Sequence, residues 1–409
     1  MQCTIGLMKI KGLLFTLALA WLGELWRWHG FLLLDLWLPC FAGAWWLHAL
    51  WQRKIPKPYP FIWGFFFVAF GWAALITHSI MMPLGDLAQA ALYGVRWFSL
   101  FTLYLIGQDL PEPNKKTLRW AILIFASALS LAGFVQMYFV PDFGAYESLG
   151  WDPHVDRLLS TWFDPNFVGG FLAFAVPLSL GWSLDLPKKR QGIALALTAL
   201  CALALGLTLS RSGYLALAAA LACFGALRSW KWILGFILLG LLTLSLSTSI
   251  QTRALALTSS IESFFTESYT LPDASARLRF GSWQEGWDLF MEAPLFGQGY
   301  NRYADAALEL GTLKDSNIHS ASGSDSSLLT VFASTGLFGG TAFLALFLSL
   351  LHQAWANRKD GYALGFFTGT LGLFVHSVFV NSLLFPLLLA PFFIAAGLLA
   401  PVDLKKGFR

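Results

Sequence analysis

Charged side chains are scarce in this chain of 409 residues, since 12% of the residues are Asp, Glu, Lys or Arg and 57% are hydrophobic. A soluble domain usually carries about 25% charged residues, so water is excluded as the solvent for much of this chain. The mean hydropathy of +0.62 indicates lipid instead. The 19 Trp and 37 Phe, many near the ends of apolar runs, are typical of aromatic belts at a membrane interface.

Cysteines and basic clusters are also few. The four cysteines lie at the N-terminus or within apolar runs, and their spacing fits neither a metal site nor a disulfide framework. They are Cys3, Cys40, Cys201 and Cys223. No basic stretch alternates with aromatic residues on a polar face, so nothing indicates binding to nucleic acid. The first apolar run follows Lys9 and Lys11 without a small-residue cleavage site, which favours a retained span over a signal peptide.

The long apolar runs predict an all-α polytopic membrane protein. A spanning helix needs roughly 20 apolar residues, and by that measure the chain holds about a dozen. The predicted spans are 12–26, 31–51, 60–78, 87–107, 118–140, 163–184, 192–209, 213–227, 232–249, 325–352, 362–381 and 383–400. We expect three regions: 1–249 with spans one to nine, a large periplasmic loop over 250–324, and 325–409 with spans ten to twelve and a short cytoplasmic tail.

The basic residues predict the orientation of these spans. Lys and Arg are enriched in cytoplasmic loops. If the N-terminus is cytoplasmic, most of the 27 basic residues and few of the 23 acidic ones fall in cytoplasmic segments, and the C-terminus is cytoplasmic too. Arg96 falls within a span, and eight basic residues face outward. These are Arg27, Arg157, Arg211, Arg253, Arg277, Arg279, Arg302 and Lys314. Five of them lie in the loop 250–324, and loops of that length are usually functional.

Within this loop, residues 275–293 predict an amphipathic helix. Its apolar residues recur at helical spacing and are Trp283, Trp287, Phe290 and Met291. Such a helix could lie on the membrane surface or roof a cavity between spans. Arg279 lies on about the same face as Trp283. It either binds an anion or is an interfacial arginine that snorkels to water.

The segment Ser210-Arg211-Ser212-Gly213 predicts a turn at the outer face, because it interrupts an apolar stretch too long for one span. An arginine between two hydrophobic helices needs a carboxylate, a phosphate or a bound anion as its partner. The alternative is a tight hairpin with a snorkelling arginine. Arg96, in the fourth span, could also bind an anion. An internal ion pair with Glu24 or Asp35 explains this arginine equally well.

Asp164-Pro165-Asn166 opens the sixth span with ordinary helix-start chemistry: Asp164 as N-cap and Pro165 at the first helical position. Asn166 could still face a polar cavity.

Two outward residues could act as a general base beside an anionic leaving group. His319 lies in the stretch before the tenth span, and Asp325 is expected to cap that span. The structural alternatives are an exposed loop histidine and a simple N-cap. His376 and Asn381, near the outer end of the eleventh span, are weaker candidates.

The order of these features resembles the O-antigen ligase and O-antigen polymerase superfamily of bacterial envelope glycan assembly. The resemblance covers about 158–345. In chain order its motifs are Thr161-Trp162-Phe163-Asp164-Pro165-Asn166, Leu209-Ser210-Arg211-Ser212-Gly213, Arg279 with Trp283, Pro294-Leu295-Phe296-Gly297-Gln298-Gly299-Tyr300, and Leu329 with Gly336-Leu337-Phe338-Gly339. Family members transfer a glycan from a polyprenyl-diphosphate carrier to an acceptor hydroxyl outside the bacterial cytoplasmic membrane. The acceptor expected here is a glycan, a lipid or a protein.

The resemblance implies that Arg211 and Arg279 hold the donor diphosphate, with Arg277 beside them. We further expect a substrate cavity that includes Asn166, Asp164, Trp283 and Ser326. No metal and no cofactor are expected, because arginines can replace a cation at the leaving group.

One departure concerns the base. The family's usual His-Asn pair is replaced by Asp325 and Ser326, and the nearest histidine is His319. Either Asp325 or His319 is therefore expected to accept the proton. These residues do not separate a ligase from a polymerase.

The alternative function is a transporter of an anionic solute or a lipid-linked glycan. Transporters place ionisable residues in the middle of the membrane, often in repeated halves. Here they concentrate at the outer face, and no repeat is visible. A passive scaffold would leave the outward arginines without a role.

Overall fold

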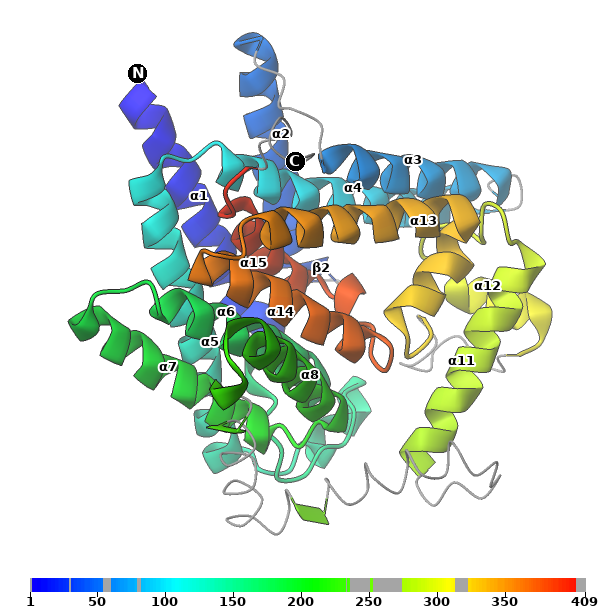
Figure 1. Cartoon of the computed structure of the whole chain (residues 1–409). Helices are drawn as coiled ribbons and strands as arrows, with labels where there is room; N and C mark the ends of the chain where they lie inside the picture. The colour runs from blue at the N-terminus through cyan, green and yellow to red at the C-terminus, as the bar shows by residue number, and fades with distance from the viewer. Residues whose placement is uncertain are drawn as a thin grey trace.

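The computed structural model describes residues 2–28, 31–53, 60–78, 82–232, 234–235, 251–252, 274–312 and 323–401 (Figure 1). The first helices are α1 (Gln2–Leu22), α2 (Leu33–Trp51), α3 (Phe61–His78), α4 (Leu84–Gln108), α5 (Glu112–Phe139), α6 (Pro165–Ser183), α7 (Lys188–Leu207) and α8 (Arg211–Arg228). The later ones are α11 (Ala274–Glu292), α12 (Tyr303–Leu310), α13 (Ser327–Ala356), α14 (Gly361–Ser377) and α15 (Pro386–Gly397). Short 3-10 helices lie at η1 (Gly23–Leu25), η3 (Gly144–Leu149), η4 (Ser160–Trp162) and η6 (Ser382–Leu384).

The helices agree with the predicted spans over the described residues. Each predicted span contains a helix except 232–249, which lies mostly outside those residues. Seven helices are long and apolar enough to cross a membrane. They are α1, α2, α4, α5, α6, α7 and α13. Two more, α3 and α15, are apolar but shorter. The chain is thus a helical multi-pass membrane protein, and the count of twelve spans stays a prediction.

A small β pair is an exception to the predicted all-α fold. Strand β1 (Arg27–Trp28) pairs antiparallel with β2 (Phe31–Leu32), with Arg27 opposite Leu32. The pair joins the end of η1 to the start of α2, so it closes a tight connection between two spans and does not alter the helical architecture.

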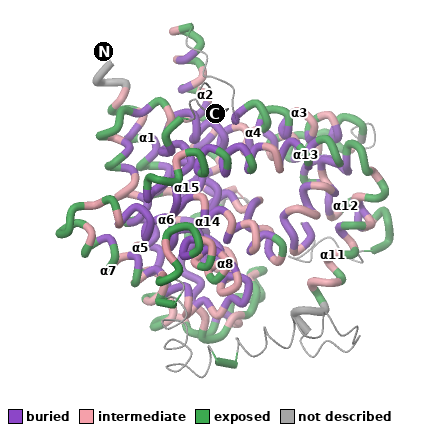
Figure 2. The backbone as a smooth tube through the Cα atoms, viewed as in Figure 1, coloured by how far each residue is buried: buried purple, intermediate pink, exposed green. Residues whose placement is uncertain are grey.

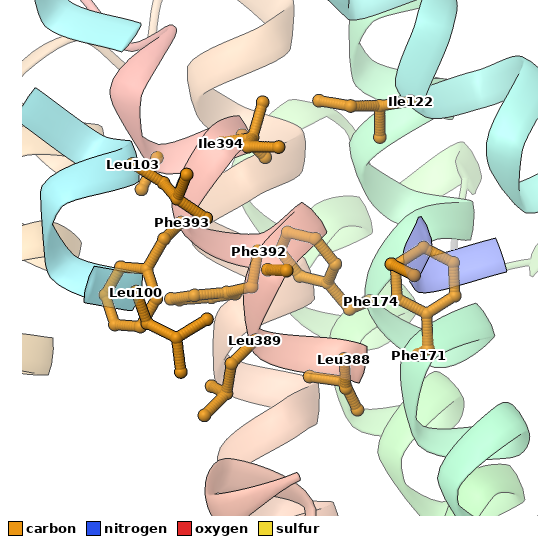
Figure 3. Packing of buried hydrophobic residues seen from close by; sticks show 14 of the residues in the cluster. Leu100, Leu103, Ile122, Phe171, Phe174, Leu388, Leu389, Phe392, Phe393 and Ile394 are labelled. Atoms are coloured by element: carbon orange, nitrogen blue, oxygen red, sulfur yellow. The ribbon is translucent and has the colours of Figure 1, made fainter. Parts of the chain in front are cut away.

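The core forms where α15 packs between α4 and α6 (Figure 3). Every residue of α15 is buried, and so is nearly all of α6, whereas α7 carries many exposed residues (Figure 2). Phe393 of α15 contacts Phe101 of α4 edge-on at 5.1 Å, and Phe392 lies 5.2 Å from Phe174 of α6. Because lipid is as apolar as these side chains, the gain comes from close packing rather than from escape from water.

Small residues bring α14 and α6 together in antiparallel contact. Gly361, Gly365 and Gly369 recur every four residues on α14 and therefore share one face. A Cβ on Gly369 would lie 2.6 Å from Phe174 O of α6, so only glycine permits this approach. The pairing places the end of α14 beside the start of α6.

Segments that the sequence predicts on one side of the membrane meet in the structure. Lys9 of α1 forms an ion pair with Asp109, which follows α4. On the opposite side, Leu158 N donates to Leu207 O at 3.0 Å, and Asp325 N donates to Ser282 Oγ at 2.8 Å. The second side carries the start of α6, the α7–α8 turn and α11, and we call it the site face.

Helix α11 lies where the sequence predicts an amphipathic helix, but its packed face differs from the predicted stripe. Gly286 and Leu289 are buried, and Phe290 lies edge-on at 5.7 Å from Phe332 of α13. Trp287 and Met291, both expected on the apolar stripe, are 53% and 54% exposed. The stripe therefore divides between contact with α13 and an exposed side.

Candidate functional site

A cavity of about 250 Å³ opens on the site face, where four segments far apart in the sequence meet. Its lining residues are Asp152, His154, Arg157, Asn166, Leu209, Arg211, Leu278, Arg279 and Asp325. Four of the predicted site residues, Asn166, Arg211, Arg279 and Asp325, thus line one cavity. Asn166 lies on α6, Arg211 on α8 and Arg279 on α11, and Asp325 lies just before α13 (Figure 1).

The predicted turn before α8 sets the position of Arg211. Leu209 has a left-handed backbone with φ 51°, which reverses the chain after α7. Ser210 then caps α8, because its Oγ accepts a hydrogen bond from Gly213 N at 3.3 Å. Arg211 becomes the first residue of α8 and is 9% exposed. Its guanidinium and the amino end of the helix add positive charge to the same region.

Arg279 and Asp325 reach the cavity from elements that are tied together. Ser282, on α11 three residues after Arg279, accepts the hydrogen bond from Asp325 N at 2.8 Å. Burial raises the pKa of Asp325 above the usual range of an aspartate, and the guanidinium of Arg279 offsets part of this shift. The negative charges of Asp164 and Asp152 raise the pKa of Asp325 further. Asp325 is therefore a stronger base than an exposed carboxylate.

A third arginine, Arg157, also lines the cavity, although no role was predicted for it from the sequence. Arg157 donates from Nε to Thr208 O at 2.8 Å and from Nη2 to Asn166 Oδ1 at 3.3 Å. Its Nη1 lies 3.4 Å from His154 Nδ1. These contacts fix the guanidinium plane before any substrate binds. The only signal in the sequence was its outward position against the charge bias of the loops.

Three possible metal ligands lie at the edge of the cavity. Asp152, His154 and Asp164 each offer one ligand atom, and these atoms lie within 4.8 Å of one another. Asp164 Oδ1 already accepts hydrogen bonds from Asn166 N at 2.6 Å and Phe167 N at 3.2 Å. Nδ1 of His154 faces the Arg157 guanidinium, whose charge opposes a cation. The sequence reading missed this cluster, and the expectation of no metal stays a prediction.

Three of the predicted cavity residues are absent from its lining over the described part of the chain. Asp164 is the N-cap of α6, as the helix-start reading expected. Trp283 packs against Phe280 and Phe379, with ring centroids 5.3 and 5.7 Å away. Ser326 caps α13, since its Oγ accepts from Leu329 N at 3.5 Å. The expectation that Asp325 caps this span was therefore wrong, and its carboxylate remains on the cavity wall.

Two further candidates lie outside what the structure describes. His319 is not among the described residues. Arg277 belongs to α11, but its side chain is not described. Their predicted roles as base and as diphosphate ligand stay predictions.

The ion-pair explanation of Arg96 is correct. Its Nε lies 2.7 Å from Asp35 Oδ1, and Nη2 donates to Asp35 Oδ2 at 2.8 Å. Glu24, the other proposed partner, pairs with Arg27 at 2.7 Å. The Arg96–Asp35 ion pair joins α4 to α2, and neither residue lines the cavity.

The glycine-containing motifs at 294–300 and 336–339 lie against each other and are joined by backbone hydrogen bonds. The segment after α11 donates from Gln298 N to Ala333 O and from Gly299 N to Ser334 O, each at 2.8 Å. In return Leu337 N donates to Pro294 O at 2.8 Å. Helix α13 is kinked at Gly336, which frees these backbone groups. The motifs thereby anchor α11, and with it Arg279, on α13.

The chain is thus a multi-pass membrane protein with a cavity lined by three arginines and two aspartates. Residues 196–344 match the family model described as O-antigen ligase, which supports the resemblance that the motifs indicated. The match includes Arg211, Arg279 and Asp325. It supports a membrane glycan-processing enzyme. No curated protein matches the chain.

Proposed function

We propose that this protein transfers a glycan from a polyprenyl-diphosphate carrier to an acceptor hydroxyl at the outer face of the bacterial cytoplasmic membrane. The observation that carries the proposal is the convergence of Arg157, Arg211 and Arg279 with Asp325 on one cavity. Such a cavity suits a doubly charged leaving group on one side and a nucleophile on the other.

The arginines bind the donor diphosphate. A guanidinium matches two phosphate oxygens at once and keeps its charge at any physiological pH. Arg157 is held in place by Thr208 and Asn166, so little reorganisation is needed as charge develops. Catalysis requires that these contacts strengthen when the diphosphate leaves, because equal binding of ground and transition states would not raise kcat.

Asp325 accepts the proton of the acceptor hydroxyl. As that oxygen forms a bond to the anomeric carbon of the donor sugar, the bond from this carbon to the diphosphate oxygen breaks. The proton passes to the Asp325 carboxylate, and the electron pair leaves with the polyprenyl diphosphate. Burial of Asp325 favours this step, because it raises the pKa of the carboxyl.

The test is transfer by the purified protein in detergent. The protein receives a polyprenyl-diphosphate oligosaccharide and a panel of glycan, lipid and peptide acceptors, with EDTA present. Lengthening of the glycan on its carrier would indicate a polymerase, and transfer to a lipid or protein hydroxyl a ligase. No product, together with uptake or flipping of a glycan or anion in proteoliposomes, would replace the proposal with the transporter alternative.

A matched pair of arginine variants makes the test specific. Arg211→Ala should abolish transfer while the protein stays folded. Arg358→Ala should leave it unchanged, because Arg358 is exposed and its guanidinium lies over the Trp355 ring, 4.1 Å from the centroid, away from the cavity lining. Equal loss in both variants would point to general damage rather than to the cavity.

A further inference from the structure

A chain of hydrogen bonds runs from the cavity wall into the helix bundle. Asn166 Oδ1, which accepts from Arg157, also accepts from Ser210 Oγ at 3.1 Å. Ser210 Oγ lies 3.1 Å from Ser212 Oγ. Ser212 Oγ in turn lies 3.2 Å from Nε2 of His376, at the end of α14. The chain therefore joins α6, the start of α8 and α14.

His376 is held from both sides at the inner end of this chain. Its Nδ1 lies 3.0 Å from Ser382 Oγ of η6, and the residue is 0% exposed. A neutral imidazole offers one donor and one acceptor, and a hydroxyl can be either. Because Ser210 Oγ gives its one proton to Asn166, the intact chain requires Ser212 to donate to Ser210 and Nε2–H of His376 to donate to Ser212, which leaves Nδ1 to accept from Ser382. A buried imidazole with both nitrogens hydrogen-bonded holds its partners in place, because loss of either hydrogen bond would leave a buried polar atom unpaired and raise the free energy.

The neighbouring helix leaves room for the imidazole. A Cβ on Gly170 of α6 would lie 2.7 Å from His376 Cε1 and Nδ1, so any larger residue there would displace the ring. One residue earlier, a Cβ on Gly169 would lie 3.1 Å from Ser210 Cβ. The two glycines make the space in which the turn before α8 and the histidine meet.

The two serines in the chain flank Arg211 directly. Ser210 and Ser212 are its neighbours in sequence, and both are nearly fully buried, at 1% and 4% exposed. Their hydroxyl groups therefore fix the backbone on each side of Arg211. The direction in which its guanidinium enters the cavity depends on this backbone.

We propose that His376 is the positioning residue for Arg211. It does not line the cavity and acts through Ser212, so that Arg211 meets the leaving diphosphate in a fixed geometry. This inference rests on the proposed function and adds a residue that lies outside the matched segment 196–344. A displacement of about 1 Å at a catalytic group can cost on the order of 100-fold in rate.

The experiment compares three variants in the transfer assay with the full-length protein. His376→Phe fills the space without hydrogen bonds and should lower kcat by about 10- to 100-fold, with KM for the donor within about threefold of wild type. His376→Gln, which can donate and accept, should recover most of this loss. Ser377→Ala is the matched control, because Ser377 is equally buried but its Oγ donates only locally to Phe374 O at 2.7 Å. It should not change kcat.

A double-mutant cycle tests the route through Arg211. Arg211→Lys alone should retain a small activity, and adding His376→Phe should lower it by less than about threefold, because both changes disturb the same contact. Ser212→Ala provides a second route if His376→Phe does not fold, and it should lower kcat in the same way. Thermal unfolding in detergent monitors folding throughout.

The outcomes separate the two proposals. Wild-type kcat in folded His376→Phe or Ser212→Ala, no recovery by His376→Gln, or losses that multiply in the Arg211→Lys background would each overturn the role of His376. No transfer by wild type and Ser377→Ala with any acceptor would overturn the proposed function, and the inference with it.

Discussion

Gly297 and Gly336 face each other so closely that a Cβ on Gly297 would lie 2.5 Å from Gly336 N. A Cβ on Gly336 would meet Leu295 O in the opposite direction. Both glycines have positive φ, 77° and 62°, a region that L side chains rarely adopt. The motifs at 294–300 and 336–339 thus form one joint, by which we mean their direct backbone contact. This joint holds α11, and with it Arg279, against α13.

The joint predicts a stability effect for Gly336→Ala. The added Cβ meets backbone rather than a movable side chain and favours negative φ, so we expect a loss of stability of about 2 to 4 kcal/mol. Transfer should fall as well, because Arg279 loses its support. Thermal unfolding in detergent measures the first effect. Gly281→Ala on α11 is the control, since nothing lies within 4 Å of its Cβ position. An unchanged unfolding temperature for Gly336→Ala would contradict the joint.

The base assignment predicts the pH dependence of transfer. Asp325 must be deprotonated to accept a proton, and burial raises its pKa above the usual aspartate range. The rate should therefore rise as pH increases through this raised pKa and be lost on its acid side. Asp325→Asn should lose at least about 100-fold in kcat, whereas the exposed Asp305→Asn should be neutral. A normal acid limb in Asp325→Asn would assign the base to another residue.

The departure from the family pattern gives a separate prediction. Asp325→His restores the residue type that family members use at this position, so it should retain transfer. The acid limb of its pH profile should move toward the ordinary histidine pKa of about 6.5. Measurement of kcat against pH for both proteins tests this shift. An inactive but folded Asp325→His would show that the carboxylate does more than accept a proton.

The third arginine predicts a defect that lysine cannot repair. Arg157→Lys loses the planar fork that bonds Thr208 and Asn166 together. Both Arg157→Ala and Arg157→Lys should lower kcat/KM for the donor by about 10- to 100-fold. Arg358→Ala serves as control, because Arg358 is exposed and lies outside the cavity lining. Full activity of Arg157→Lys would mean that only its charge matters.

The metal-free mechanism predicts that chelation has no effect. Transfer with EDTA should equal transfer without it, because the arginines supply the positive charge. Asp152→Asn should then change the rate by less than about threefold, since Asp152 neither binds the diphosphate nor takes the proton. Loss of transfer with EDTA, with recovery on adding Mn²⁺, would instead assign a metal to Asp152, His154 and Asp164.

The charged site residues predicted from the sequence are expected at the outer ends of membrane spans or in the outer loop, where arginines are unusual. Arg211 and Arg279 were found because outward arginines oppose the charge bias of the loops, and Asp325 because an outward carboxylate near arginines suits a general base. The N-cap role of Asp164 and the Arg96–Asp35 pair also followed from local chemistry. Each of these predictions rests on residues within one segment or on opposite charges that need a partner. Both can be read from the sequence directly.

Contacts between distant segments were beyond such reasoning. The roles of Arg157 and His376 depend on which helices meet at the site face, and that follows from the packing of α14 on α6. The N-cap of α13 is Ser326 and not Asp325, because the hydrogen bond that Asp325 N donates to Ser282 Oγ holds Asp325 elsewhere. Trp287 and Met291 share the predicted stripe with Phe290, but only Phe290 packs against α13, so periodicity alone did not show which residues of the stripe contact the rest of the protein.

The most direct test of the central claim measures glycan transfer and release of polyprenyl diphosphate together, in one reaction with EDTA. If Arg211 and Asp325 act as proposed, wild type yields equal amounts of both products, and Arg211→Ala and Asp325→Asn yield neither although both remain folded. Wild-type amounts of both products from folded Arg211→Ala would contradict the proposal, because the leaving diphosphate would then not depend on the arginine that the cavity places beside it.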